Sequence, residues 1–167
     1  HHEKAKTVNV DISNKNINFN FLKDVETIIH LASISEKNSK KNKKKVKQAN
    51  YNFVKDLFEQ SKKYNVRRII KISTAKVYGL NLNKRVTEKS KLRPFSDYAY
   101  YHAKSDKFLY KNIDKGKLDI IILRISNGFG APKTTKKDCW DLIVNNFCYN
   151  GFKNKKITIK FKLNIKK

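Results

Sequence analysis

The chain has 167 residues, enough for one domain with a buried core, and 39% of them are hydrophobic. Its 39 Lys and Arg residues against 14 Asp and Glu residues give a net charge of +25. Such a charge suits a polyanionic partner, but arginine, the residue preferred for bidentate contacts to phosphates and bases, is scarce. We interpret the charge as a lysine-rich solvated surface, which disfavours nucleic acid as a partner, and keep a basic nucleic-acid binder as the alternative.

Cysteine spacing argues against a metal site, and hydropathy argues against a membrane-spanning segment. Cys139 and Cys148 have neither a CxxC nor a Cys/His metal-binding spacing, so no metal site is expected. Two isolated thiols suit a reducing compartment, which predicts a cytoplasmic protein. No apolar run is long enough to cross a membrane and no signal-peptide core is visible, so we expect no membrane partner.

Short apolar or β-branched runs predict the strands. TVNVDI at 7–12 alternates and is expected to form a short strand. Three continuous apolar runs are typical of buried parallel strands: VETIIHLAS at 25–33, VRRIIKIS at 66–73 and LDIIILRIS at 118–126. KITIKFKL at 156–163 ends the chain with a strand-like alternation of lysine and apolar residues.

Helical periodicity predicts the elements between these strands. The dense charge run at 36–47 predicts a solvated loop that enters a helix, with a nucleic-acid-binding arm as the alternative. From Val46 to Phe58 apolar residues recur at helical spacing, and further helices are expected at 97–113 and 138–149. Strands that alternate with helices indicate an α/β fold with a parallel sheet in a single domain.

The helix expected at 97–113 carries two pairs of a tyrosine and a base, Tyr98 with His102 and Tyr100 with Lys104. Both pairs have the i,i+4 spacing that makes neighbours on a helix. At about 100° per residue, the first pair shares a face with Leu109, whereas the second lies among lysines. The periodicity therefore turns Tyr98 and His102 toward the interior and Tyr100 and Lys104 toward solvent.

A tyrosine beside a base has a chemical use. Phenol has a pKa near 10, so it is a poor base at neutral pH. A nearby cation favours the phenolate and lowers this pKa. The tyrosine can then move a proton at a substrate hydroxyl or carbonyl oxygen. A histidine provides such a charge only when it is protonated. The alternative is that Tyr98 and His102 simply pack in the core with satisfied polar tips.

Four stretches follow one another in a recognisable order: IIHLAS at 28–33, IKISTAKVYG at 70–79, LRPFSDYAYYHAK at 92–104 and LRISNGFGAP at 123–132. This series resembles the extended short-chain dehydrogenase/reductase family, the NAD-dependent epimerase/dehydratases, which act mainly on nucleotide sugars. The resemblance extends from about Val8 to Ile159. It implies an α/β, partial Rossmann-like, doubly wound parallel sheet with NAD or NADP as cofactor.

The resemblance implies catalytic roles for three residues. Tyr98 takes the position of the catalytic tyrosine, Thr74 that of the catalytic hydroxyl, and His102 the position usually held by a lysine. In such an enzyme Tyr98 would take the hydroxyl proton of the sugar and Thr74 would polarise the same oxygen. A subset of the family with YAxxH, SNGFGAP and a CW…LIVN helix is similar to this chain and is associated with surface-polysaccharide sugar metabolism.

The resemblance also implies binding residues. Asp11 resembles the acidic residue near the adenine, and Asn50 the helix asparagine that steadies the central strands. The implied cofactor-binding residues are Asp11, Leu31, Ala32, Ser33, Asn50, Ser73, Tyr98, His102 and Ser126. The implied substrate-binding residues are Thr74, Asn127 and Gly128.

One motif of the family is absent, the G-x-x-G-x-x-G turn that brings the pyrophosphate to a helix N-terminus. The chain starts with HHEKAKT and contains no methionine, so we expect it to lack the first strand–helix–strand unit and to bind NAD(P) weakly. Residues 151–167 are expected to begin an absent or altered substrate-binding region. The alternative to an enzyme is a catalytically inactive fragment or interaction module of this fold, and a second copy of the chain is a candidate partner.

Overall fold

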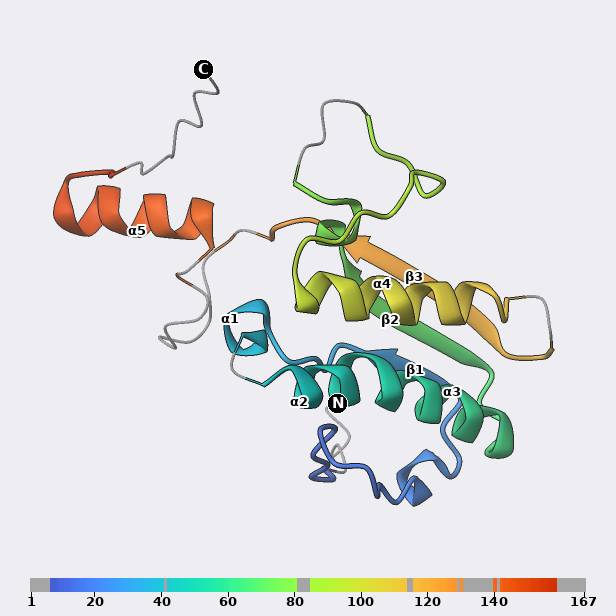
Figure 1. Ribbon diagram of the computed structural model, residues 1–167. Helices are drawn as coiled ribbons and strands as arrows, with labels where there is room; N and C mark the ends of the chain where they lie inside the picture. Colours follow the sequence, from blue (N-terminus) through green and yellow to red (C-terminus); the bar gives the residue numbers. More distant parts are fainter. Residues whose placement is uncertain are drawn as a thin grey trace. The chain divides into compact units, whose positions relative to one another are not determined.

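The computed structural model describes residues 7–40, 42–80, 85–113, 116–128, 130, 140 and 142–158. The chain forms two compact units, His1–Ser126 and Asn127–Lys167, and each is described by itself. The first unit contains a sheet and its covering helices (Figure 1). The second contains helix α5, Ile143–Asn154.

The sheet of the first unit has three parallel strands in the order β1–β2–β3, which confirms the predicted α/β class with a parallel sheet. Their bounds are Thr27–His30, Arg68–Thr74 and Asp119–Ile125. Ile28, Ile69 and Ile120 lie side by side across the sheet, so equivalent positions of the three strands share a face.

Helices follow the strands in the order expected for parallel crossovers. The helix predicted from Val46 is part of a longer series: α1 Glu36–Ser39, α2 Lys43–Lys47, the π-helical turn η2 Gln48–Asn52 and α3 Phe53–Lys63. The predicted helix at 97–113 is α4, Asp97–Tyr110. Short 3₁₀ turns occur at η1, Asn20–Leu22, and at η3, Ala75–Tyr78.

Local capping fixes the ends of the two longest helices of the first unit. The Ser96 side chain accepts a hydrogen bond from the Ala99 amide at 3.2 Å and so caps the start of α4. Asp97 lies in the first turn, where its negative charge interacts favourably with the helix dipole. α3 ends where Asn65 takes a left-handed conformation with φ +56°, and the Val66 amide bonds back to the Ser61 carbonyl at 2.9 Å. These ends set where α4 presents its first turns to the sheet.

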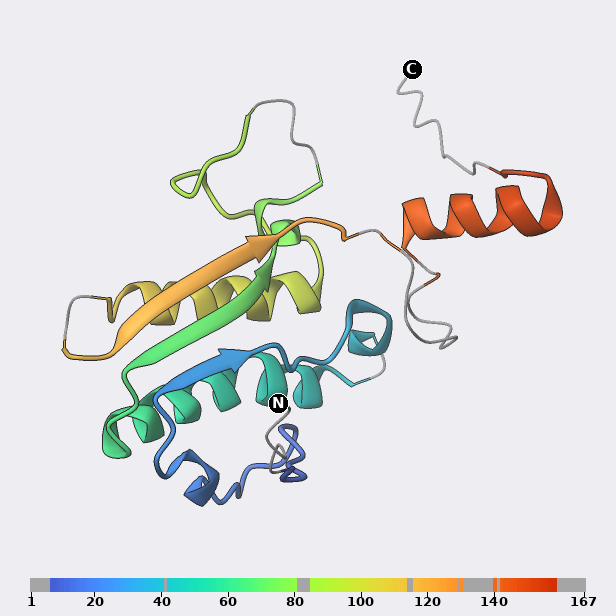
Figure 2. The same ribbon diagram turned by 180° about the vertical axis from the view of Figure 1, so that it is seen from behind.

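Helices α3 and α4 cover one face of the sheet, as Figure 2 shows from the opposite side. The core between them contains Val54 and Phe58 of α3, Leu109 of α4, and Ile69 and Ile120 of the strands. A second apolar cluster joins the N-terminal segment to α3 through Phe19, Leu22, Phe53 and Leu57. Several apolar side chains on the other face stay exposed, with relative exposures of 59% for Ile29, 69% for Leu31, 46% for Leu123 and 56% for Ile125.

Two strand predictions were wrong in whole or in part. Residues 7–12 form no strand, because alternation alone supplies no neighbouring strand to accept the backbone hydrogen bonds. The predicted strand at 25–33 is limited to Thr27–His30, the residues that pair with Arg68–Lys71, and beyond it Leu31 is 69% exposed rather than buried. The segment before β1 packs through Ile12 and Ile17 against the second cluster instead.

The C-terminal predictions are met in part. The helix predicted at 138–149 begins at Ile143 and continues to Asn154, where Lys155 takes a left-handed conformation with φ +53°. Residues 138, 139 and 141 of that prediction lie outside the described residues. Of the strand-like run at 156–163, residues 156–158 form no strand and the rest lies outside the described part of the chain.

Candidate functional site

The carboxyl ends of the parallel strands lie at one edge of the sheet, which is where ligands bind in open α/β sheets. β2 ends at Thr74, and η3 follows immediately with the Lys76 amide bonded to the Thr74 hydroxyl oxygen at 3.3 Å. Further along the chain, α4 begins at Asp97 and places Tyr98 in its first turn. The strand end and the helix start therefore both contribute side chains at this edge.

The structure brings together the three side chains predicted to be catalytic. The rings of Tyr98 and His102 lie edge to face, 4.5 Å between centroids at 63°. Tyr98 also forms a side-chain hydrogen bond with Thr74. The competing tyrosine on the same helix, Tyr100, is 47% exposed and packs on Tyr101 instead, so the two tyrosines lie as the helical periodicity predicts.

Burial of Tyr98 raises the pKa of its phenol above the ordinary value. The hydrogen bond from Thr74 works in the opposite direction, and the carboxylate of Glu36 adds to the increase. Glu36 in turn forms an ion pair with Lys76, the residue next but one to Thr74. In this arrangement Tyr98 is a neutral phenol at neutral pH, able to donate one hydrogen bond and to accept another.

His102 is buried, and burial lowers the pKa of its imidazole to about 3. The charge of Lys71 also lowers this pKa, whereas the charge of Asp106 raises it. The imidazole is therefore neutral at pH 7. Nδ1 lies 3.4 Å from Nζ of Lys71. Nε2 is buried and has no hydrogen-bond partner among the described residues. A neutral imidazole cannot provide the cation that a lysine at this position would give to Tyr98.

A buried charge cluster that the sequence analysis missed lies next to His102. Lys71 of β2 donates to Asp106 of α4 at 2.7 Å, and both side chains are almost completely buried. The other carboxylate oxygen of Asp106 accepts from Ser73 at 2.9 Å and from Arg124 of β3 at 2.9 Å. The available signal was a lysine inside an apolar strand, since a buried charge requires a partner.

Asn50 anchors the segment that leaves β1. Its side chain accepts from the Ile34 amide at 2.8 Å and donates to the Ile34 carbonyl at 3.1 Å. Asn50 belongs to the π-helical turn η2, a local geometry that often marks functional positions. These two bonds hold the chain just after the predicted cofactor-lining residues Leu31, Ala32 and Ser33.

We expect Asn50→Ala to release this segment, because the partly buried Ile34 amide and carbonyl both lose their hydrogen-bond partner. The cost is about 1–3 kcal/mol of unfolding free energy, with the largest increase in amide hydrogen exchange at Ile34. Asn52→Ala is the matched control, since Asn52 lies in the same turn and its side chain donates to Gln48 rather than to Ile34. Equal exchange at Ile34 in both variants would contradict this role.

The remaining predicted binding residues are more dispersed. Leu31, Ala32 and Ser33 are exposed directly after β1, whereas the Ser73 hydroxyl is directed into the buried cluster and donates to Asp106. The Asp11 carboxylate, exposed, accepts from the Ser13 amide and hydroxyl at 2.8 and 2.7 Å, which lowers its pKa. Ser126, Asn127 and Gly128 are exposed, and the last two belong to the second unit.

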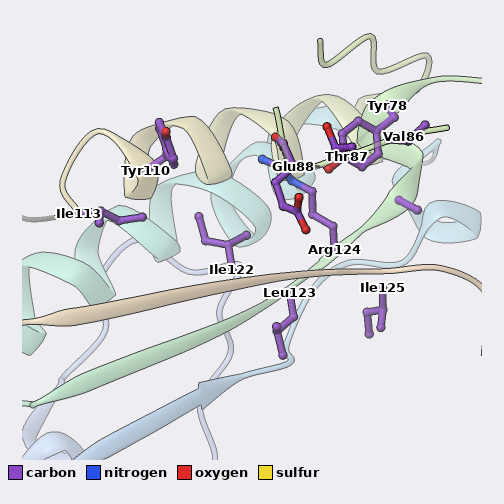
Figure 3. A pocket seen from close by; sticks show the side chains of 11 residues that line it. Tyr78, Val86, Thr87, Glu88, Tyr110, Ile113, Ile122, Leu123, Arg124 and Ile125 are labelled. Carbon is purple, nitrogen blue, oxygen red and sulfur yellow. Dashed lines mark hydrogen bonds between the residues drawn. The ribbon is translucent and has the colours of Figure 1, made fainter. Parts of the chain in front are cut away.

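A cavity of about 650 Å³ lies along β3, and none of the three predicted catalytic side chains lines it. Figure 3 shows Ile122 and Arg124 pointing toward α4, and Leu123 and Ile125 pointing to the opposite side of the strand. Arg124 reaches the Tyr78 hydroxyl at 2.9 Å and the Glu88 carbonyl at 3.3 Å. A second cavity, of about 450 Å³, lies beside β1 and is lined in part by Leu31 and Ala32.

Metal-binding clusters and membrane-spanning helices are both absent from the part of the chain that the structure describes. No group of three or more His, Cys, Asp or Glu side chains there could hold a metal ion. Within the same residues, no helix combines the length and the apolar composition that crossing a membrane requires.

The residues present fit one end of a dinucleotide cofactor. The unpartnered Nε2 of buried His102 beside Tyr98 suits a hydroxyl group such as those of a ribose. The exposed chain at Leu31 to Ser33 is free to approach a flat ligand at the same edge of the sheet. The chain contains no Gly-rich turn for a pyrophosphate, so only the ribose end of the cofactor is accounted for.

The chain resembles known proteins over most of its length. A model of the NAD dependent epimerase/dehydratase family matches residues 1–158. The dTDP-D-glucose 4,6-dehydratase of Dictyostelium discoideum is 29% identical over 147 residues, which are 81% of this chain and 33% of that protein.

Solved structures of similar fold include enzymes that act on nucleotide sugars. The UDP-N-acetylglucosamine 4-epimerase of Methanobrevibacter ruminantium M1 matches with a TM-score of 0.68 and 27% identity, over 85% of this chain and 45% of that one. The dTDP-glucose 4,6-dehydratase DesIV of Streptomyces venezuelae matches with a TM-score of 0.67 and 26% identity, over 81% and 41%. The chain thus spans from a third to under a half of the length of these proteins.

Proposed function

Because this chain belongs to the NAD dependent epimerase/dehydratase family, we propose that it serves an NAD(P)-dependent epimerase, dehydratase or reductase that acts on a nucleotide sugar. The observation that carries the proposal is the contact of Tyr98 with both Thr74 and His102 at the carboxyl edge of the sheet. The similar 4-epimerase was solved with UDP-N-acetylmuramic acid, and DesIV with NAD and TYD. These two complexes support both halves of the proposal, the cofactor and the substrate class.

In this proposal each of the three side chains has one task. In its phenolate form Tyr98 takes the proton from a sugar hydroxyl, and the phenol that results returns the proton to the carbonyl oxygen in the reverse direction. Thr74 hydrogen-bonds the same oxygen and holds it against Tyr98. His102 and the backbone of Leu31, Ala32 and Ser33 would hold NAD(P), which when bound supplies the hydride acceptor and donor.

The other predictions extend this proposal. Residues 151–167 begin an altered substrate-binding region, Asn127 and Gly128 contact the sugar, and Asp11, Asn50, Ser73 and Ser126 complete the cofactor site. The protein acts in the cytoplasm, in the synthesis of surface polysaccharide, and two copies associate as a homodimer.

A second candidate function is a non-catalytic module of the same fold. It is favoured by the chemistry of the site, since burial raises the pKa of Tyr98 and leaves His102 uncharged beside it. Such a module would keep the cluster of Tyr98, Thr74 and His102 for stability alone. Turnover measurements separate the two candidates.

We expect Tyr98→Phe to lower turnover about a hundredfold or more, because it removes the only hydroxyl in this cluster that can exchange a proton with the substrate oxygen while Thr74 holds it. The assay incubates the chain with NAD⁺ and, separately, UDP-N-acetylglucosamine or dTDP-glucose, and follows sugar products by NMR and reduced cofactor by absorbance. Tyr100→Phe is the matched control and should keep full turnover, since Tyr100 is 47% exposed.

The outcomes divide the candidates cleanly. Turnover that falls in the Tyr98 variant alone supports the enzyme. Turnover that falls in the Tyr100 variant alone would contradict the choice of tyrosine. No turnover by the unaltered chain with either sugar would favour the non-catalytic module.

A further inference from the structure

The carboxylate of Asp106 fixes the position of the Lys71 ammonium group. Oδ2 of Asp106 accepts from Ser73 and from Arg124, each at 2.9 Å, which leaves Oδ1 for Lys71 at 2.7 Å. All three donors come from strands β2 and β3, and the acceptor from α4. Because the lysine side chain is only 1% exposed, its ammonium cannot turn to water and stays beside the helix.

From that position Lys71 faces His102, one helical turn before Asp106. The ammonium has three protons and no acceptor capacity, so at 3.4 Å from Nδ1 of His102 it can only donate. A neutral imidazole whose Nδ1 accepts a hydrogen bond must have its proton on Nε2. Nε2 is the buried atom that has no partner among the described residues.

We propose that Lys71 is a positioning residue of the candidate site, which holds His102 as the neutral Nε2–H tautomer and so keeps one N–H donor ready beside Tyr98. The distance from Lys71 to His102, the saturation of Asp106 and the unpartnered Nε2 carry the proposal. Its catalytic meaning rests on the proposed function: the site then has a fixed neutral donor where a lysine would provide a charged one. A buried N–H without an acceptor is unfavourable until a hydroxyl oxygen pairs with it, and a ligand can bring that oxygen.

The test reads the tautomer directly. In the full chain labelled with ¹⁵N-histidine, two-bond ¹⁵N–¹H correlations distinguish Nε2–H, Nδ1–H and the charged imidazolium. The chain has four histidines, and the His102 signals are the ones that disappear in a His102→Gln variant. We expect a single Nε2–H form of His102 at neutral pH. An Nδ1–H form, or an imidazolium, would overturn the proposal.

Substitution of the lysine tests its part in this arrangement. We expect Lys71→Met to abolish the preference and to give a mixture of both neutral tautomers. Lys104→Met is the matched control, because Lys104 lies on α4 but stacks on Tyr51 at 4.6 Å, and it should leave His102 unchanged. A pure Nε2–H form in Lys71→Met would overturn the proposal. If that variant does not fold, the spectrum of the unaltered chain decides.

The tautomer and turnover are independent readouts. A chain with the Nε2–H form and no turnover would contradict the proposed function and leave the role of Lys71 intact. A chain with turnover and an Nδ1–H form would support the proposed function and contradict the role of Lys71.

Discussion

Asp106→Asn is expected to destabilise the chain by about 3–5 kcal/mol, because it leaves the buried Lys71 and the partly buried Arg124 without their counter-charge. The Asp106 carboxylate is completely buried and accepts from Lys71, Ser73 and Arg124. Asparagine keeps the shape of the side chain but has one acceptor oxygen in place of two and no charge. Since a domain of this kind is stable by only about 5–15 kcal/mol, the loss is a large fraction of the total.

The loss should also depend on pH, in a direction that identifies Lys71. Burial lowers the pKa of Lys71, and the charge of Asp106 is the main opposing effect. Without that charge the folded-state pKa falls further below the unfolded value, so the unfolded variant binds more protons between the two. The stability of Asp106→Asn should therefore rise as pH increases above 7, while the contribution of unpaired Arg124 persists, since a guanidinium does not lose its proton.

Urea unfolding at several pH values measures both effects, and Asp119→Asn is the matched control. Asp119 also pairs with an arginine, Arg68 at 2.6 Å, but the two side chains are 47% and 38% exposed. An exposed ion pair contributes about 0–1 kcal/mol, so this variant should lose little. Equal losses in the two variants would show that the Asp106 cluster is not a buried one.

The sequence predicted the parts of the site that depend on local periodicity. Ser96 starts a regular helix, so the direction of Tyr98 and His102 follows from residue spacing alone. The role of Thr74, by contrast, was implied by the family resemblance and not by periodicity. The parallel sheet was also predictable, because its strands are short apolar runs separated by helices.

What the sequence did not predict depends on pairing in three dimensions. Lys71 meets Asp106 only because β2 lies under α4, and a pattern of polar and apolar residues gives no such register. The alternation at 7–12 reports a preference for extended backbone but not whether a neighbouring strand exists. The π-helical turn at Gln48–Asn52 differs from an α-helix by one residue per turn at most, which a search for helical spacing cannot detect.

Two buried histidines make the stability of this fold sensitive to acid. His30 of β1 and His102 of α4 are both buried, and burial, followed by the charge of Lys71, lowers their pKa to about 4 and about 3. Asp106 opposes the shift of His102, and each added proton would also face the charge of Lys71. The folded chain therefore keeps both imidazoles neutral at pH 7 and below.

We expect stability to fall steeply as pH drops below 6.5, the ordinary histidine value. The unfolded chain then binds close to two more protons than the folded chain, which corresponds to about 2.7 kcal/mol per pH unit and about 4 kcal/mol at pH 5. The stability that each neutral histidine contributes is fully present above pH 6.5. It is lost progressively as the pH falls from 6.5 to the folded-state pKa values of about 4 for His30 and about 3 for His102. The chain should thus unfold in mildly acidic buffer that most domains tolerate.

The slope of stability against pH tests this reasoning better than the stability itself. Urea unfolding between pH 6.5 and pH 5 gives the slope, and His30→Gln should halve it whatever the variant costs at pH 7, because one of the two titrating imidazoles is gone. The side chain of His30 packs beside Phe53, 5.6 Å between ring centroids, so a repacking cost would shift every pH equally. A slope near zero in the unaltered chain would mean that neither histidine is held neutral by its surroundings, and the donor role inferred for His102 would lose its physical basis.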